Sequence, residues 1–459
     1  MKKEGQQQQR RFPTGLDIAR SYADGKSNPV EVARSALAKA KDVPSAFLSV
    51  TTERALREAE ASAQRWQIGA PLSALDGVPV AWKDLFDIAG TVTTAGSKVF
   101  SERPAATADA PLVASTSAAG LVCIGKTALS ELAFSGLGLN PHFGTPTNPY
   151  LDRGTRAPGG SSSGSAIAVA MGIVPIAVGT DTAGSIRVPS ALNGLTGYRA
   201  SRVRYDGRGS INLAPSFDTI GLIAQTVADC VAFDNVLRGA CRDSSSPATL
   251  EGKKFIVDPS LTARYGVTAA VQTNFRAFLE ELERNGAAVE ERELQSLADI
   301  YTLIRDRGWP GGLEAFALHR ALLDSPDAER IDQRVRVRLE ANRKVPPERL
   351  DELMEHRNRL SRLFAAEVGD ATVVMPTVAH VAPPVAELEN DPELFARVNL
   401  ATLAITMLGS FLDTPAIAMR SGLDGVGLPT SVQLIRPEGD DAKLLQLGLA
   451  VEERLTHGR

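Results

Sequence analysis

The stretch PGGSSSGSA (residues 158–166) leads through the most apolar run of the chain into GTDTAGSIR (residues 179–187). Glycine and serine crowd together in the first motif and then give way to small apolar residues, which is typical of a loop that opens a buried helix. A flexible linker has a similar composition, but here an apolar segment and the strand-like PIAV follow immediately. We therefore predict that the first motif lies inside a hydrophobic core.

Short β-branched runs alternate with longer helical patterns around these motifs. Helical periodicity covers residues 29–41 and 51–66, and residues 300–368 are strongly charged and helical. Alternation of this kind predicts an α/β fold in which helices sandwich a mostly buried sheet. The expected strands are LVCIGK near 121, PIAVG near 175, KFIVD near 254, TVVMPT near 372, AIAMR near 416 and SVQLI near 431.

No internal repeat and no linker rich in proline, glycine or serine divides the 459 residues. We predict a disordered N-terminus at residues 1–12 and a single domain at 13–459. Within it we expect an N-terminal helical cover at 13–70, a catalytic core at 71–240 and a variable helical region at 300–370. The last should be a solvated cap that helps to build the wall of a substrate pocket.

The composition argues against several classes of function. Basic and acidic residues number 50 and 54, so the net charge is −4 and no broad positive surface is expected for nucleic acid or anionic lipid. Three cysteines, Cys123, Cys230 and Cys241, fit neither a disulfide framework nor a zinc pattern. No cluster of His, Cys, Asp and Glu has ligand spacing, so we expect no metal site.

The sequence also carries no signal for export or membrane insertion. The N-terminal MKKEGQQQQRRF lacks the apolar stretch of a secretory signal. The most apolar run, residues 166–178, contains Gly172 and Pro175 and is too short to cross a bilayer. We therefore expect a cytoplasmic protein without membrane contact.

Two further features point to chemistry. The chain leaves the strand PIAV through Thr182, Ala183 and Gly184 into Ser185, a turn that can aim successive N–H groups at one point and hold an oxyanion. In GVPVAWKD, Lys83 interrupts an apolar strand-like run. Lysine is almost never fully buried without a partner, so Lys83 is either an edge charge or a functional base.

Several serine mechanisms compete for these residues. The residues 160–164 literally match G-x-S-x-G, which would make Ser162 the nucleophile of a Ser-His-Asp enzyme. A nucleophile elbow follows a hydrophobic strand, however, whereas the irregular YLDRGTRAPGG precedes these serines, and the histidines lack an evident acid partner. The β-lactamase type needs S-x-x-K, and no lysine of this chain has a serine three positions before it.

A third mechanism joins the motifs, because together they resemble those of the amidase signature family. The matching segments are LDGVPVAWKD (75–84), GGSSSGSA (159–166) and GTDTAGSIR (179–187). The likeness extends through GKTALSELAFSG, FGTPTNPY, SFDTIG and GLPTSVQLI, and so covers nearly the whole chain from about residue 70, least well between 300 and 370. The resemblance implies the family's α/β fold, a large mixed β-sheet covered by helices on both sides.

The resemblance implies a Ser-cisSer-Lys triad of catalytic residues. Ser185 would attack a carbonyl carbon and form an acyl-enzyme. Ser161, which the family joins to its preceding glycine, here Gly160, by a cis peptide bond, would pass the proton from Ser185 to neutral Lys83. The backbone N–H groups of the turn would form the oxyanion hole: Thr182, Ala183, Gly184 and Ser185.

Other residues follow from the same resemblance. Ala133 and Phe134 fall where the family lines its acyl pocket, and Gly160, Ser162 and Asp181 would support the site. Two departures stand out: Ser163 and Ala183 occupy positions where the family commonly has glycine. Neither residue touches a side chain of the expected triad. These two departures therefore affect the expected geometry of the loops and leave the expected mechanism unchanged.

The function expected from the sequence is hydrolysis of a C–N bond in a small neutral amide, anilide or carbamate, through a seryl acyl-enzyme and without a cofactor. The expected partner is that small-molecule substrate, and the prediction allows a homodimer. One alternative is the amidase subunit of a glutamine-dependent tRNA amidotransferase. Another is a non-catalytic scaffold that kept the fold.

Overall fold

The computed structural model describes residues 12–149, 151, 155–239 and 249–456. One 11-stranded sheet contains all the named strands within these ranges, in the order β1-β3-β2-β4-β6-β5-β10-β11-β9-β7-β8. The expectation of disorder at residues 1–12 lies, apart from Phe12, outside the described residues. The shared sheet supports the proposal of a single domain.

The strands pair in both senses, which makes the sheet mixed. Neighbours are parallel in β3-β2-β4 and in β9-β7-β8, and the pairs between these two groups are antiparallel. The strands are β1 (Phe47–Val50), β2 (Pro79–Lys83), β3 (Val122–Thr127), β4 (Ile176–Asp181), β5 (Thr196–Arg199), β6 (Thr219–Ala224), β7 (Lys254–Val257), β8 (Ala288–Glu291), β9 (Thr372–Pro376), β10 (Ala416–Leu423) and β11 (Pro429–Ile435).

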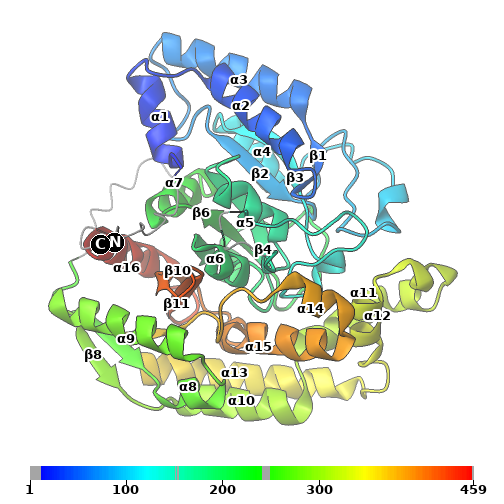
Figure 1. Ribbon diagram of the computed structural model, residues 1–459, viewed down its shortest axis with the longest axis vertical. Helices are drawn as coiled ribbons and strands as arrows, with labels where there is room; N and C mark the ends of the chain where they lie inside the picture. Colours follow the sequence, from blue (N-terminus) through cyan, green and yellow to red (C-terminus); the bar gives the residue numbers. More distant parts are fainter. Residues whose placement is uncertain (1–11, 150, 152–154, 240–248, 457–459) are drawn as a thin grey trace, which may run out of the picture.

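Helices lie on both faces of this sheet (Figure 1), so the predicted α/β architecture is confirmed. They are α1 (Gly15–Ala23), α2 (Pro29–Asp42), α3 (Thr52–Gln67), α4 (Pro111–Ala118), α5 (Ser163–Ala170), α6 (Arg187–Asn193), α7 (Val227–Leu237), α8 (Ser260–Arg264), α9 (Ala269–Arg284), α10 (Gln295–Arg307), α11 (Pro310–Leu323), α12 (Gln333–Glu340), α13 (Glu348–Val368), α14 (Val385–Asn390), α15 (Pro392–Phe411) and α16 (Asp441–Thr456).

The six strands expected from β-branched runs are present as β3, β4, β7, β9, β10 and β11. The strand-like run GVPVAWKD forms β2, whereas the sequence did not reveal β1, β5, β6 and β8. Strand β5, TGYR, is short and contains a glycine, and β8, AVEE, is a largely exposed edge strand without apolar alternation. Such strands form because a neighbour offers hydrogen bonds, which a local pattern does not encode.

Side-chain alternation assigns each face of β2 to a different core. Val80 and Trp82 pack in the cluster that includes α7 and α16, whereas Ala81 packs in the cluster that includes α5. Because successive strand residues point to opposite faces, Lys83 lies on the same face as Ala81 and therefore on the side of α5. This places the lysine beside the serine-rich loop that leads into α5.

One helix among the described residues is long and apolar enough to cross a membrane by length and composition. It is α15, which the sequence analysis did not single out, and 61% of its most apolar window is buried inside the protein. Its residues Ile405, Leu408 and Phe411 belong to the core. Burial of this kind is typical of a core helix, which fits the expectation of a protein without membrane contact.

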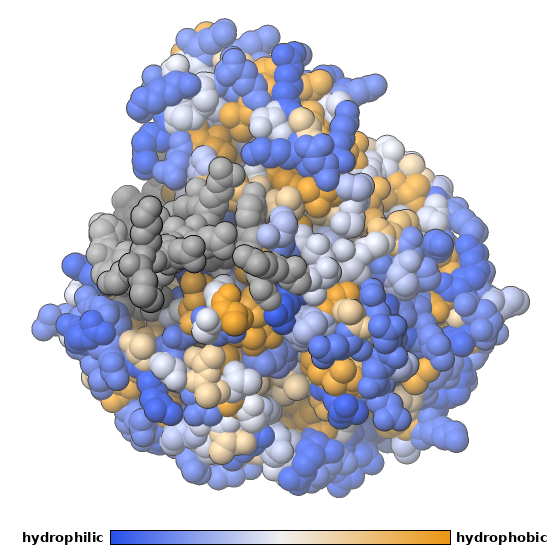
Figure 2. Space-filling model, in the orientation of Figure 1, coloured by the Kyte–Doolittle hydropathy of each residue, from blue (hydrophilic) through white to orange (hydrophobic). Residues whose placement is uncertain are grey.

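Residues 295–368 form the helices α10 to α13, as the charged pattern predicts. On the face shown in Figure 2, hydrophilic side chains cover the outer helices, and hydrophobic residues gather in patches between them. Ile331, Val335 and Leu339 on and beside α12 pack in one cluster with Leu132 and Ala133. The cap helices α11 and α12 are thereby anchored to the loop that follows β3.

Candidate active site

Lys83 ends β2 and is completely buried. Its Nζ donates hydrogen bonds to Ser161 Oγ at 2.7 Å and to Thr180 Oγ1 at 2.9 Å. The structure therefore brings together two of the three residues predicted for the triad. Thr180 lies in the motif GTDTAGSIR, but no sequence pattern assigns it a contact with the lysine.

The surroundings of Lys83 disfavour its positive charge. Burial lowers the pKa of Lys83 to about 7, against the attraction of the Asp218 and Asp181 carboxylates. Burial also raises the pKa of Asp218 to about 6, although Thr182 Oγ1 donates to it at 2.5 Å and the N–H groups of Leu213 and Ala214 donate as well. Near neutral pH a substantial fraction of Lys83 is thus an uncharged amine.

Two closely packed loops hold Ser161 in place. The Gly160–Ser161 peptide bond is cis. Gly160 N–H donates to Gly136 O at 2.8 Å, and Ser130 N–H donates to Ser161 O at 3.1 Å. A Cβ on Gly160 would lie 2.6 Å from Gly138 N and 2.7 Å from Ser135 O, so this close approach requires glycine. The segment 130–138 and the serine-rich loop therefore pack as one unit.

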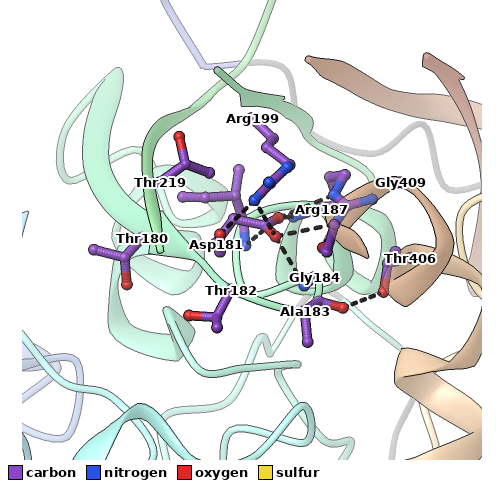
Figure 3. Close-up of polar contacts among 12 residues, drawn as sticks. Thr180, Asp181, Thr182, Ala183, Gly184, Arg187, Arg199, Thr219, Thr406 and Gly409 are labelled. Atoms are coloured by element: carbon purple, nitrogen blue, oxygen red, sulfur yellow. Dashed lines mark hydrogen bonds and ion pairs between the residues drawn. The ribbon is translucent and has the colours of Figure 1, made fainter. Parts of the chain in front are cut away.

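Asp181 organises the turn that leads from β4 into α6 (Figure 3). Its carboxylate accepts hydrogen bonds from Gly184 N–H at 2.8 Å and from Ile186 N–H at 3.2 Å. The buried Arg187 donates to it through Nε and Nη2, each at 3.0 Å. Burial alone would raise the pKa of Asp181, but Arg187 and Arg199 outweigh it and hold that pKa well below its usual range. Asp181 is thus a permanent anion that fixes the turn.

The N–H groups of this turn are not all available for a ligand. Gly184 N–H is engaged by Asp181, whereas those of Ala183 and Ser185 donate to no acceptor within the described residues. Gly184 has a φ of +137°, and a Cβ there would overlap Thr406 Oγ1. Thr406 in turn donates to Ala183 O at 2.6 Å, which keeps the Ala183 peptide oriented. The turn therefore offers three free donors on a fixed backbone, the N–H groups of Thr182, Ala183 and Ser185.

Ser185 is next to these donors and 5% exposed. Its backbone carbonyl accepts from Ser162 N–H at 3.3 Å, which joins it to the loop of Ser161. Among the described residues its Oγ forms no hydrogen bond, to Ser161 Oγ or to any other atom. The loops of the two serines thus meet through backbone contacts, and the hydroxyl of Ser185 remains available.

Ser162, the alternative nucleophile, has a different environment. It is fully buried, its Oγ donates to Thr180 O at 3.4 Å, and an irregular loop rather than a strand precedes it. No histidine in the described part of the chain hydrogen-bonds to Ser161, Ser162 or Ser185. This arrangement disfavours a Ser-His-Asp site on Ser162.

Ala133 and Phe134, the expected acyl-pocket residues, lie in and after a short helical turn at Glu131–Ala133. Leu132 and Ala133 have φ values of +51° and +58°, a left-handed conformation that sequence patterns did not predict. Ala133 is buried, and Phe134 is partly buried in the cluster that joins this turn to α12. The side chain of Arg338 on α12 lies over the Phe134 ring.

The cap reaches the site at a second place, which the sequence did not predict. Glu314 on α11 accepts from Ser216 N–H at 2.9 Å, and Arg357 on α13 donates to Ser216 O at 2.7 Å. Both contacts hold the segment just before Asp218. The motif SFDTIG contains Ser216 and Asp218, but only the tertiary structure reveals that they connect the cap with Lys83.

A family model described as Amidase matches residues 30–445 of this sequence. The chain belongs to the amidase family. The resemblance seen in its motifs is therefore confirmed, and an amidohydrolase is the activity class that the family supports.

Two curated relatives illustrate the range of this family. The amidase-family chain is 32% identical to a subunit of the glutamyl-tRNA(Gln) amidotransferase of Cupriavidus necator, over 95% of each chain. It is also 32% identical to the 2-amino-5-chloromuconic acid deaminase of Comamonas testosteroni, over 85% of this chain and 84% of that protein. This chain is equally similar to proteins with different names, so sequence identity alone does not indicate its substrate. In one fold, the side chains that line the pocket determine which substrate is accepted.

Solved structures agree with the fold. A crystal structure of an amidase superimposes with a TM-score of 0.83 at 28% identity, over 96% of this chain and 99% of the other. A chain from a vestigial protein complex, described as revealing the evolutionary origins of an s-triazine catabolic enzyme, gives a TM-score of 0.84 at 26% identity, over 96% of this chain and 98% of the other. The mixed sheet with its helical covers is thus shared along nearly the whole length.

Proposed function

We propose that this amidase-family chain hydrolyses the C–N bond of a small amide, anilide or carbamate through an acyl-enzyme on Ser185. The observation that carries this proposal is the buried Lys83, whose amine donates to Ser161 Oγ at 2.7 Å and whose pKa is lowered to about 7. A neutral amine at this position is a base that can accept a proton through a serine hydroxyl.

In the proposed acylation, Ser185 Oγ attacks the substrate carbonyl carbon while its proton passes to Ser161, and the Ser161 proton passes to Lys83. The oxyanion that forms accepts hydrogen bonds from the N–H groups of Ala183 and Ser185, with Thr182 beside them. Asp181 holds the Gly184 N–H, so we assign Gly184 to shaping the oxyanion hole rather than to donating within it.

The tetrahedral intermediate then loses its amine. The Lys83 ammonium returns a proton through Ser161 to the leaving nitrogen, the C–N bond breaks and the acyl group stays on Ser185. A water molecule attacks the acyl carbon in the second half, again giving its proton to Lys83 through the same relay. The acid product leaves and Ser185 recovers its proton, which completes the cycle.

The direct test is covalent labelling. A fluorophosphonate should modify one serine, because only a hydroxyl coupled to a base and beside oxyanion donors is nucleophilic enough. Peptide mapping should identify Ser185, and Ser185→Ala should abolish the label. A label on Ser162 in the wild type would overturn the proposal, as would the absence of any label together with no turnover of amides, anilides, carbamates and ureas, which would favour a non-catalytic scaffold.

The small-molecule substrate, a cytoplasmic location and any homodimer remain predictions from the sequence. A second candidate function has its own support, because several relatives at 30–32% identity over 95% of this chain are subunits of glutamyl-tRNA(Gln) amidotransferases. Such a protein would release ammonia from glutamine for a partner. A glutaminase assay and co-purification of a second protein test this candidate, and glutaminase activity confined to that complex would replace the first proposal.

A further inference from the structure

Thr182 and Asp218 lie opposite each other where β4 ends and β6 begins. These strands are antiparallel, and Asp181 is paired with Thr219. The residue after Asp181 and the residue before Thr219 are therefore neighbours across the two strands. Thr182 Oγ1 donates to the Asp218 carboxylate at 2.5 Å. This hydrogen bond attaches the start of the turn that carries the proposed oxyanion donors to the segment that precedes β6.

The Ala183 N–H lies between two anchors of this turn (Figure 3). On one side the Thr182 hydroxyl is bound to Asp218, and on the other Thr406 Oγ1 donates to Ala183 O at 2.6 Å. The peptide group that presents the Ala183 N–H joins Thr182 to Ala183, and because it is planar its orientation depends on the residues at its two ends. Release of Thr182 from Asp218 would therefore let this N–H turn away from an oxyanion.

The cap holds the segment that carries Asp218. The buried Glu314 on α11 accepts from Ser216 N–H at 2.9 Å, and the buried Arg357 on α13 donates to Ser216 O at 2.7 Å. The guanidinium carbon of Arg357 also lies 4.6 Å from the centroid of the Phe217 ring. Two cap helices thus bind the backbone of one residue, two positions before Asp218.

The segment 213–218 can transmit a displacement of the cap because it is closed on itself. The Asp218 carboxylate accepts from the N–H groups of residues 213 and 214, and the Asp218 N–H donates to the carbonyl of residue 214. Both backbone groups of Ser216 are bound to side chains of the kind that form charge-assisted hydrogen bonds, which are stronger than neutral ones. Loss of the contact with Glu314 should therefore shift this segment, with the Asp218 carboxylate, relative to Thr182.

We propose that Glu314 is a positioning residue for the proposed oxyanion hole, with Arg357 as its partner in holding Ser216. Ser216 keeps Asp218 in place, and Asp218 keeps Thr182 and the N–H group that follows it aimed at the oxyanion. This inference rests on the proposed function, because it gives the cap a part in stabilising the tetrahedral intermediate. The cap then affects kcat through the transition state, in addition to any effect on KM through contacts with the substrate.

Two substitutions of Thr182 test the inner end of this series of contacts. Thr182→Val keeps the shape of the side chain but removes the hydroxyl, whereas Thr182→Ser keeps the hydroxyl. At about pH 9, where Lys83 is largely neutral, Thr182→Val should lower kcat for an anilide about 10- to 100-fold, approaching the loss of one oxyanion donor. KM should stay within threefold, and Thr182→Ser should stay close to the wild type. A kcat for Thr182→Val within threefold of the wild type would overturn the proposal.

Glu314 tests the outer end. Glu314→Ala should lower kcat about tenfold at unchanged KM, because a displaced donor stabilises the oxyanion less well. Glu314→Gln should restore most of the activity, since its amide oxygen can still accept from Ser216 N–H. Glu329→Ala is the matched control in the cap, because Glu329 is largely exposed and pairs with Arg336. A Glu314→Ala variant that changes only KM would show a role in the pocket and would overturn the proposal.

The double variant Thr182→Val/Glu314→Ala tests whether the two residues act through the same contacts. If Glu314 acts through Thr182, the double variant should lose no more kcat than Thr182→Val alone, because the link is already broken. Losses that multiply would mean that Glu314 acts independently of Thr182, and the proposed connection would be wrong.

Hydrogen exchange separates this inference from the proposed function, because it observes the turn without catalysis. Glu314→Ala should speed exchange of the Gly184 and Ile186 amides, which are bound to Asp181. If a fluorophosphonate does not label Ser185 but exchange still depends on Glu314, only the proposed function is wrong. If Ser185 is labelled and kcat does not depend on Glu314, only this inference is wrong.

Discussion

Lys83 contacts two hydroxyl groups and, among the described residues, no carboxylate within hydrogen-bond distance. A hydroxyl can accept from the amine in one protonation state and pass a proton in the next, whereas a carboxylate would hold the ammonium. Proton exchange at neutral pH also requires a pKa near 7, and burial lowers the Lys83 pKa from 10.5 to about 7. The side chain is therefore suited to exchange protons near neutral pH.

The proton that Lys83 returns should matter more for a poor leaving group than for a good one. An amine leaves a tetrahedral intermediate poorly unless it is protonated, whereas a phenolate leaves with much less help. Lys83→Ala should therefore cost at least tenfold more kcat/KM on an anilide than on the ester of the same acyl group. Lys443→Ala, on the exposed surface of α16, is the control. Equal losses on amide and ester would mean that Lys83 does not supply the leaving-group proton.

The second prediction concerns pH. Because the neutral amine is the base, kcat/KM should rise as the pH increases through about 7 and then level off. The Asp218 carboxylate attracts the ammonium and thus raises the Lys83 pKa, so removing its charge must lower that pKa. Asp218→Asn should shift the rise to lower pH, measured against Asp306→Asn, whose side chain is exposed. A shift to higher pH, or none, would contradict this electrostatic coupling.

At the scale of elements, the turn between β4 and α6 is built around Asp181. The carboxylate joins the turn to two buried arginines, and Arg187 continues to Gln433 on β11 and Ser410 on α15. Breaking a buried charged network leaves unpaired charges and typically costs about 3–5 kcal/mol. The free donors of Ala183 and Ser185 are thus fixed by elements far away in the sequence.

Gly184→Ala tests how closely this turn is fitted. A Cβ there would meet Thr406 Oγ1 and would have to adopt a φ of +137°, so the turn must move. Since loss of one oxyanion donor costs about 10²- to 10³-fold in rate, we expect a fall of at least 100-fold in kcat. Gly425→Ala, where a Cβ meets nothing within 4 Å, is the control for stability measured by thermal unfolding. A kcat within tenfold of the wild type would show that the turn tolerates displacement.

At the scale of the whole molecule, the cap connects the two sides of the site. It touches the acyl side through Arg338 and Phe134 and the Asp218 side through Glu314, Arg357 and Ser216. The loops of the proposed relay come from residues 83–218, whereas these cap contacts come from residues 314–357. Variation in the cap can therefore change the substrate while the proton relay stays the same.

Independence from metals is a prediction that concerns the whole molecule. The described residues contain no group of three or more His, Cys, Asp or Glu side chains that could hold a metal ion. The proposed oxyanion donors are backbone N–H groups, so the proposed reaction needs no Lewis acid. EDTA should leave kcat unchanged, with a zinc peptidase as the positive control for chelation. Activity that vanished with EDTA and returned with zinc would refute the mechanism.

The class of fold and the candidate residues of the proposed relay could be predicted from the sequence. Short β-branched runs predicted six strands because buried strands select such residues locally, and the order of motifs identified Lys83, Ser161 and Ser185 as candidates. The sequence did not predict β1, β5, β6 and β8, the contact of Thr180 with Lys83, or the contacts of Asp218, because each depends on a partner distant in the chain.

The pKa of Lys83 and the side chains that surround the candidate site depend on the tertiary structure. A lysine in an apolar run has a lowered pKa only if the folded core excludes water from it, and no pattern in GVPVAWKD reports that exclusion. From the sequence, we expect Arg338 to be a solvated charge on a helix, as we expect for Arg334 and Arg336. Folding alone places it over Phe134, with no carboxylate partner among the described residues, because the pairing of charges depends on distances in space rather than on positions along the chain.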